Sequence, residues 1–239
     1  MTYSVIARCP RTGRLGIGTA SYTMAIGAHC DGAVRPNVGV TITQGFPLPR
    51  NNRLAVNLLA QGYTPSQVMA ELAANDSDHE FRQIAVIDRE GAGVAHTGSK
   101  VRPVCAQRVG SGFVALGTML ASEKVLDALV AGFEADKHLD LEDRLLAALE
   151  HGRDAGGLKG SKGALKERSV ALIIWDKRDY SDLDLRVDLK DDAIAELRRI
   201  YIDFKPTGAY YEERARHPRN AIPAMEFADM LKGQQKETS

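Results

Sequence analysis

The chain opens with two segments whose pattern is typical of β-strands. Residues 3–9 and 15–21 are rich in apolar and β-branched side chains, and Pro10-Arg11-Thr12-Gly13 between them has the composition of a turn. Two such segments separated by a turn cluster predict an antiparallel hairpin. A third strand is predicted over 38–43, which is rich in valine and threonine and ends at Gln44-Gly45.

The spacing of apolar residues then changes to the period of a helix. Leucines at helical spacing predict a helix over 52–61, and Gly62 is a natural end for it. Thr64-Pro65-Ser66-Gln67 has the form of a capping box with proline in the first turn. We therefore expect a second helix that begins there and continues through Leu72.

Strands and helix pairs continue to alternate along the rest of the chain. Further strands are predicted over 82–88, 93–97, 113–116, 169–175 and 183–187, and further helices from Ser122, over 140–152 and over 192–201. The glycine- and lysine-rich segment 156–163 is predicted to be a loop. This order does not match the strict βαβ alternation of a parallel sheet. It predicts an α+β fold in which helix pairs pack on antiparallel sheets.

The length of 239 residues favours one large domain with an appendage. We place the domain at 1–203 and interpret 204–239 as a C-terminal arm, because the composition changes at Phe204. Tyr210-Tyr211 would leave aromatic surface exposed on this arm. We therefore expect the arm to pack on the core or on a neighbouring subunit, which predicts a homo-oligomer.

Charge and targeting signals exclude several classes of protein. Thirty-one Lys and Arg balance thirty-one Asp and Glu, whereas proteins devoted to nucleic acid or to anionic membranes normally carry a basic surplus. No apolar stretch is long enough for a membrane span, and no signal-peptide pattern is present. The three cysteines have no C-x-x-C spacing. These features predict a soluble cytoplasmic protein that acts on a small molecule.

The glycine-rich segments and the histidines do not indicate a cofactor. Gly157 to Lys162 lacks the spacing of a phosphate-binding loop, and Gly110-Ser111-Gly112 precedes strand-like rather than helical sequence. The six histidines form no i, i+4 pair. We therefore predict no nucleotide cofactor and no metal.

Thr2 carries the most informative chemistry. Met1 is generally removed before such a small side chain, which would leave a threonine hydroxyl beside a free α-amine. An α-amine has a pKa of about 7.7 to 8.0, so near neutral pH it can take the hydroxyl proton and return it to a leaving amine. One residue would then supply nucleophile and base. The predicted strand that begins at Tyr3 would hold this terminus rigidly.

Several motifs together resemble one known family. They include Thr2-Tyr3-Ser4-Val5-Ile6-Ala7-Arg8, Thr19-Ala20-Ser21, Val38-Gly39-Val40-Thr41-Ile42-Thr43-Gln44, His96-Thr97-Gly98-Ser99, Ala155-Gly156-Gly157 and Asp184-Leu185-Arg186-Val187-Asp188. Over residues 2–200 the chain is similar to the uncharacterised bacterial family numbered 1028 in the domain-of-unknown-function series. This resemblance implies an N-terminal-nucleophile (Ntn) hydrolase-like fold, a four-layer αββα sandwich, which agrees with the predicted order of elements.

The resemblance also implies a site. It points to Thr2 as the nucleophile of an amidohydrolase that cleaves a small polar amide through an acyl-threonine ester. Arg35 matches an arginine of the family pattern, and a cation near the terminus would favour the neutral amine. Ser21 is expected to hydrogen-bond the amine or the substrate, and the backbone N–H near Gly45 is a candidate oxyanion donor. The predicted substrate-binding residues are Ser4, Gln44, Gly45 and Ser169.

Two further hypotheses stay open beside this one. The chain has Leu116 and Thr118 where the family usually places Gln and Asn around a glycine, and it carries an insert over 158–168. If these positions line the pocket, the substrate or the activity changes. The protein would then be a non-hydrolytic member that binds a metabolite or a protein partner in the cleft. The other hypothesis is a hydrolase with an internal nucleophile, Cys30 or Ser21.

Overall fold

The computed structural model describes residues 1–237 and divides into two compact units, which meet between Arg198 and Arg199. This division lies inside helix α5 (Ala193–Phe204), and the predicted boundary at 203/204 lies at the end of the same helix. The fold is of mixed α+β type, and every strand pair among the described residues is antiparallel. Within the described residues, no helix combines the length and apolar character needed to cross a membrane.

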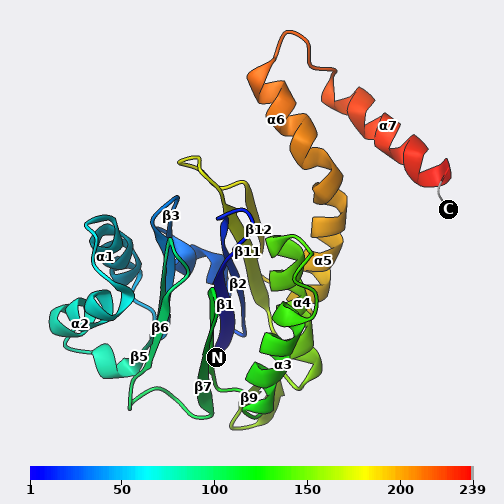
Figure 1. Cartoon of the computed structure of the whole chain (residues 1–239). Helices are drawn as coiled ribbons and strands as arrows, with labels where there is room; N and C mark the ends of the chain where they lie inside the picture. Colours follow the sequence, from blue (N-terminus) through cyan, green and yellow to red (C-terminus); the bar gives the residue numbers. More distant parts are fainter. Residues whose placement is uncertain (238–239) are drawn as a thin grey trace. The chain divides into compact units, whose positions relative to one another are not determined.

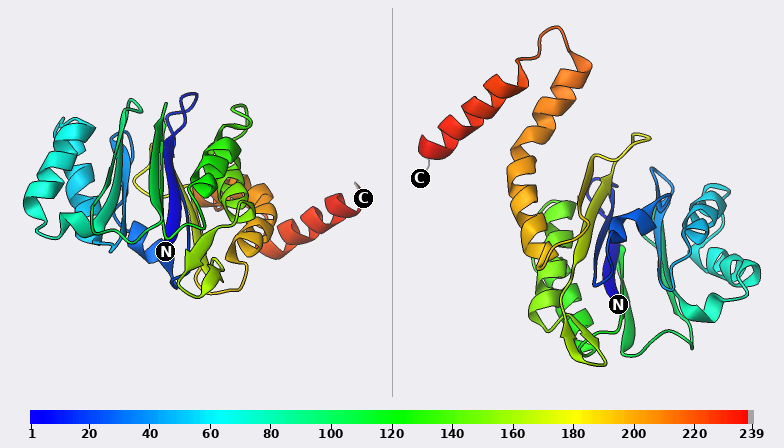
Figure 2. Two further views of the ribbon diagram at one scale, coloured as in Figure 1. Left: turned by 90° about the horizontal axis from the view of Figure 1, so that it is seen from below. Right: turned by 180° about the vertical axis from the view of Figure 1, so that it is seen from behind.

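The first unit contains two sheets that lie face to face (Figures 1 and 2). The larger sheet has the strand order β12 (Leu183–Val187), β11 (Ser169–Trp175), β2 (Leu15–Ser21), β1 (Thr2–Arg8), β8 (Phe113–Thr118) and β7 (Cys105–Gly110). The smaller sheet has the order β3 (Val34–Arg35), β4 (Gly39–Gly45), β5 (Arg82–Asp88) and β6 (Gly93–Thr97). Strand β1 therefore lies inside the larger sheet, with a partner on each side.

The inner faces of the two sheets form one core. Side chains two residues apart on a strand point to the same face. Ile6 on β1 and Ile17 on β2 thus face Ile42 on β4 and Ala85 on β5, and all four are buried in one cluster. This apolar layer holds the sheets together.

Helices cover the outer faces. Helices α1 (Pro49–Ala60) and α2 (Pro65–Asn75) pack on the smaller sheet, where Leu59 and Leu72 belong to one buried cluster with Ile84. Helices α3 (Lys124–Glu134) and α4 (Leu141–Asp154) cover the larger sheet. Gly16 permits this close approach, because a Cβ there would lie 2.6 Å from the Leu145 side chain.

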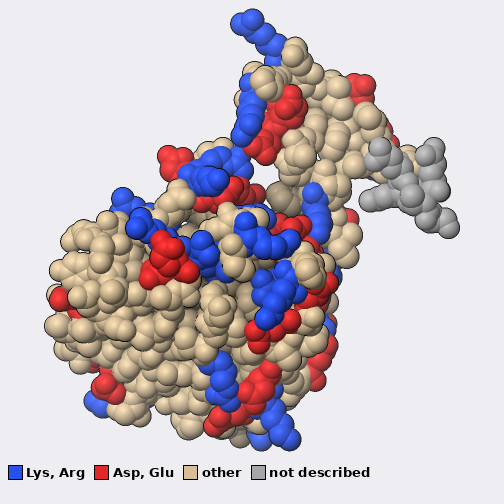
Figure 3. Space-filling model, viewed as in Figure 1, with Lys and Arg blue, Asp and Glu red and all other residues tan. Residues whose placement is uncertain are grey.

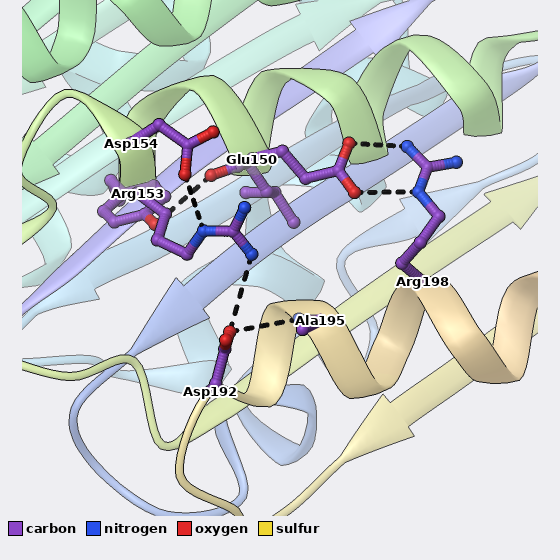
Figure 4. A network of polar contacts seen from close by, with 8 residues as sticks. Glu150, Arg153, Asp154, Asp192, Ala195 and Arg198 are labelled. Carbon is purple, nitrogen blue, oxygen red and sulfur yellow. Dashed lines mark hydrogen bonds and ion pairs between the residues drawn. The ribbon is translucent and has the colours of Figure 1, made fainter.

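The start of α5 is tied to α4 by ion pairs (Figure 4). Arg198 donates from Nε and Nη2 to the two carboxylate oxygens of Glu150, at 2.8 and 2.6 Å. Asp192 accepts from the Ala195 backbone N–H at 3.2 Å and lies 3.5 Å from Arg153. A two-point arginine–carboxylate contact sets orientation as well as proximity, so the Arg198–Glu150 pair holds the first turns of α5 against α4.

The second unit contains the end of α5 with α6 (Gly208–Arg216) and α7 (Ala224–Glu237). The rings of Tyr210 and Phe227 are stacked with centroids 3.9 Å apart, and the Tyr210 hydroxyl donates to the Ile222 carbonyl at 2.8 Å. These contacts join the two helices to each other. The predicted homo-oligomer stays a prediction.

Many elements predicted from the sequence occur with the expected bounds, including the strands over 15–21, 82–88, 93–97, 169–175 and 183–187. The capping box of Thr64 with Gln67 is present. The prediction of a loop over 156–163 is wrong, since β9 (Leu158–Gly160) and β10 (Gly163–Leu165) pair there as a hairpin. Strand β7 was not predicted, because a half-exposed edge strand such as Cys105-Ala106-Gln107-Arg108 lacks a clear apolar alternation.

Candidate active site

The layer between the sheets changes from apolar to polar at the end where β1 begins. Toward this end, the inner faces of both sheets present hydroxyl and amide side chains instead of isoleucines. These buried polar residues are Thr2, Ser4, Thr19, Ser21, Gln44, Gln83, Thr118 and Ser169. Buried polar groups require hydrogen-bond partners, and here these groups are partners of one another or of nearby backbone atoms. This polar end is the candidate active site.

Thr2 lies at its centre. It pairs in register with Ser21 on β2 and with Thr118 on β8, and only 6% of its surface is exposed. Thr2 Oγ1 lies 3.0 Å from Ser21 Oγ. The two hydroxyls face each other because both residues belong to the inner face of the larger sheet.

The Ser21 hydroxyl links the residues around Thr2. It donates to the Met1 carbonyl at 2.8 Å and accepts from the Thr23 backbone N–H at 3.1 Å. A hydroxyl has a single proton, and the Met1 carbonyl receives it. The proton in the contact between Thr2 and Ser21 therefore comes from Thr2.

The terminal amine of Met1 is electrostatically perturbed. Burial, which is the larger cause, and the positive charge of Arg102 together lower the pKa of this amine from 8.0 to about 6. Both effects act against the charged form of an amine. The amine next to Thr2 is thus neutral at neutral pH, which is the form that can accept a proton.

Two glutamines connect the sheets behind Thr2. Gln44 on β4 accepts from the Ser4 hydroxyl at 2.7 Å and donates to the Thr2 carbonyl at 3.4 Å. It also donates to Gln83 Oε1 at 2.7 Å. Gln83 Nε2 lies 3.1 Å from the carbonyls of Ala106 and Gly117, which belong to the larger sheet. This network holds the start of β1 in place.

Two adjoining hollows open beside Thr2, with cavity volumes of about 110 and 150 Å³. Met1, Thr23 and Gly45 line both of them. The first hollow continues past Thr2 to Ile26, His29, Cys30, Ile42, Thr43, Gln44 and Pro47. The second is completed by Phe46, Arg102, Thr118 and Met119. Met1 therefore occupies the place where the two hollows meet.

The structure brings most of the predicted site residues together. Ser4 and Gln44 lie behind Thr2, and Gly45 lines both hollows with a backbone φ of +86°, where a Cβ would lie 3.0 Å from the Phe81 carbonyl. Ser169, in contrast, forms hydrogen bonds with the backbone of the loop that follows β2. Its hydroxyl donates to the Thr23 carbonyl at 2.6 Å and accepts from the Ile26 N–H at 3.1 Å, so it positions the segment that lines the first hollow.

The structure does not bring Arg35 to Thr2. Arg35 pairs with Gly39 at the end of β4 opposite to Gly45, where its exposed guanidinium lies 3.5 Å from Asn57 Oδ1. The register of β4 separates it from the site. The cation that acts on the terminal amine is Arg102, in the loop between β6 and β7. No local pattern marks Arg102 in the sequence, because the tertiary fold alone places this loop beside β1.

The departures from the family pattern also lie near the site. The Thr118 hydroxyl donates to the Arg102 carbonyl at 3.0 Å and so holds the arginine-bearing loop. Leu116 is buried two residues before Thr118 on β8. The hairpin formed by the insert adjoins Met119, whose carbonyl accepts from the Lys159 N–H at 2.8 Å.

Cys30 lines the first hollow, but its environment does not activate it. Burial raises the pKa of the Cys30 thiol to about 12. Nucleophilic cysteines react as thiolates and usually have a lowered pKa. Cys30 is therefore a buried apolar side chain in the wall of the hollow.

Comparisons with known proteins place this geometry in a family. A search of curated proteins found no match. The family model described as Family of unknown function (DUF1028) matches residues 2–197. The crystal structure of protein SPO2555 from Silicibacter pomeroyi, which is described with the DUF1028 family model, is similar to this chain. The TM-score is 0.74 and the identity 27%, over 85% of this chain and 89% of that one. The chain therefore belongs to the DUF1028 family.

Proposed function

We propose that the protein is an Ntn-type amidohydrolase whose nucleophile is Thr2 and whose first unit is a four-layer αββα sandwich. The observation that carries the proposal is the position of Thr2, whose hydroxyl lies beside Ser21 and which lines the first of the two hollows, next to Met1. The environment beside Thr2 favours the neutral form of an amine, because burial and the charge of Arg102 lower the pKa of the Met1 amine there. A free Thr2 amine in this environment would supply the base that acyl transfer requires.

The reaction requires that Thr2 be the first residue. Its free amine takes the proton of Oγ1 while Oγ1 bonds to the amide carbon of the substrate. The charge on the carbonyl oxygen is stabilised by backbone N–H groups, for which Gly45 is the candidate. The protonated amine then gives its proton to the leaving nitrogen as the C–N bond breaks, leaving an ester of Thr2. Water, deprotonated by the same amine, attacks the ester and releases the acid and free Thr2.

Removal of Met1 would have two effects on the site. It exposes the Thr2 amine, and it removes the carbonyl that receives the Ser21 proton. Ser21 can then donate to the new amine or accept from it, which orients the amine toward Oγ1. Met1 also lines both hollows, so its loss enlarges the space in front of Thr2.

An internal nucleophile is less well supported. Within residues 1–237, the side-chain hydroxyl of Ser21 has hydrogen-bonding partners in Met1, Thr2 and Thr23, and none of these groups is a base. An unactivated hydroxyl is a weak nucleophile at neutral pH. The raised pKa of Cys30 argues against the thiol in the same way.

The first experiment is an intact-mass measurement on protein from its native host, where we expect Thr2 as the first residue. Release of amine is then measured over a panel of N-acylated amines. Thr2→Ala should abolish turnover and Thr2→Ser should retain part of it, with melting temperatures close to that of the natural chain. Full activity of Thr2→Ala would favour an internal nucleophile. Ligands that raise the melting temperature without being hydrolysed would favour the non-hydrolytic alternative.

A further inference from the structure

The two hollows beside Thr2 have different walls. In the first, the side chains beyond Thr2 include Ile26, Cys30 and Ile42, which provide an apolar surface. In the second, Phe46 and Arg102 provide an aromatic ring and a positive charge. The hollows share Met1, Thr23 and Gly45 as lining residues, and Thr2 lines the first, so a ligand that reaches into both occupies the hollow that contains Thr2.

Arg102 is held at the second hollow without a carboxylate partner. Its guanidinium carbon lies 5.5 Å from the centroid of the Phe46 ring, and its backbone carbonyl accepts from Thr118. Among the side chains that the structure describes, in residues 1–233, no carboxylate lies within ion-pair distance of it. Arg108, on the strand that follows, is instead paired with Asp127 at 3.0 Å. Arg102 is thus a positioned cation that is free to bind a ligand.

We infer that the substrate is an acylated amine that carries a carboxylate, and that Arg102 determines this specificity by binding the carboxylate. The planar guanidinium presents parallel N–H donors that match a carboxylate, and the cation–π contact with the Phe46 ring keeps it at the second hollow. A small apolar acyl chain fits the first hollow, which leaves the amide bond beside Thr2. The inference uses the site of the proposed function, but it concerns binding and does not depend on bond cleavage.

The preference for an anion has to be local. The net charge of the chain is zero, and on the face in Figure 3 Lys and Arg are interspersed with Asp and Glu. Such a surface creates no long-range field of one sign. A single positioned arginine is therefore the group from which selectivity for an anionic substrate would arise.

The test compares two probes of similar shape, N-butyrylglycine and its neutral amide, N-butyrylglycinamide. Both are titrated calorimetrically into the Thr2→Ala chain from which Met1 has been removed by methionine aminopeptidase, so that neither probe is turned over. We expect the carboxylate to bind about tenfold more tightly than the amide, and this ratio to fall at high salt.

Two arginine variants in the same background identify the group responsible. Arg102→Met should remove the preference for the carboxylate while leaving the affinity for the amide nearly unchanged. Arg168→Met is the matched control, because Arg168 also lies over an aromatic ring, that of Tyr22 at 5.2 Å, but lines neither hollow. It should keep the preference.

Equal affinity for the two probes, no binding of either probe, or loss of the preference in Arg168→Met would each overturn the inference. Failure of the natural chain to hydrolyse amides would instead overturn only the proposed function. The two are distinguishable because the Thr2→Ala chain reports binding without chemistry.

Discussion

The hydroxyl groups of Thr2 and Ser21 face each other across two paired strands, with their oxygens 3.0 Å apart. Because β1 lies between β2 and β8, the backbone of Thr2 is held on both sides by antiparallel ladders. A residue at the edge of a sheet or in a loop would lack this support. The position of the candidate nucleophile is therefore set by the sheet itself, which is the rigidity that a catalytic group requires.

Ser21→Ala should lower kcat about tenfold or more and leave KM nearly unchanged, since the hydroxyl acts on the amine and Oγ1 of Thr2. The measurement is steady-state hydrolysis by the processed enzyme. Thr19→Val is the control, because Thr19 makes the equivalent contact with Ser4 two residue pairs further along the ladder, at 2.7 Å. It should cost about 1 kcal/mol of stability with little effect on kcat. An equal loss of kcat in both variants would contradict a specific role for Ser21.

The pH dependence of hydrolysis should reflect the free amine of Thr2. A nearby cation disfavours protonation of an amine, and the charge of Arg102 lowers the pKa of the Met1 amine in this way. Arg102→Met should therefore raise the pKa of the Thr2 amine. The rate depends on the neutral amine. The acidic limb of the kcat/KM profile should consequently move to higher pH. A neutral substrate is used so that loss of carboxylate binding does not contribute. An unchanged profile in Arg102→Met, or an equal shift in Arg168→Met, would contradict this explanation.

Gln83→Leu should destabilise the protein by about 3 kcal/mol, measured by urea denaturation. Gln83 is fully buried, and its side chain contacts Gln44, Thr97 and the carbonyls of Ala106 and Gly117. A leucine of similar size would remove these hydrogen bonds from the polar groups around it. Gln61→Leu, at an exposed position after α1, should change stability by less than about 0.5 kcal/mol. Similar small effects in both variants would show that the hydrogen bonds of Gln83 between the two sheets add no stability.

Asp76→Asn should destabilise the protein at neutral pH and have a smaller effect in acid. Hydrogen bonds from Arg82 are the main cause that lowers the pKa of the buried Asp76 carboxyl from 3.8 to about 2, and Asn51 adds to them. A lowered folded-state pKa gives stability that is present above 3.8 and is lost as the pH falls toward 2. The free energy of unfolding of Asp76→Asn should be lower than that of the natural chain by about 2 kcal/mol near neutral pH, and this difference should shrink as the pH falls from 3.8 toward 2. Urea titrations at several pH values measure it, and a constant difference would contradict the assignment.

The limits of sequence-based prediction are visible in two arginines. Arg35 lies within a segment that matches the family pattern, but its pairing with Gly39 places it at the far end of β4. Arg102 lies in a loop without any pattern, but the Thr118 hydroxyl ties that loop to the strand beside Thr2. A motif reports local sequence, whereas distance to the nucleophile depends on which strands pair and in which register.

Gln83 illustrates a similar limit. In the sequence it is one polar residue before the apolar run Ile84-Ala85-Val86-Ile87, a position typical of a strand end. In the structure it is completely buried and connects the two sheets. Its burial follows from the second sheet, which closes over this position, and one strand contains no information about the opposing layer.

The sequence by itself determined the local elements, because the period of apolar residues and the turn and capping signals act over a few neighbours. Strands such as Ser169–Trp175 and the capping box at Thr64 belong to this class. It also singled out Thr2, since the chemistry of a terminal threonine requires only its own atoms. Only the tertiary structure decided that Thr2 faces Ser21, that Gln44 and Gln83 lie behind it, and that Arg102 supplies the cation. These relations join residues from 19 to about 100 positions apart, and their energies arise only once the two sheets have packed against each other.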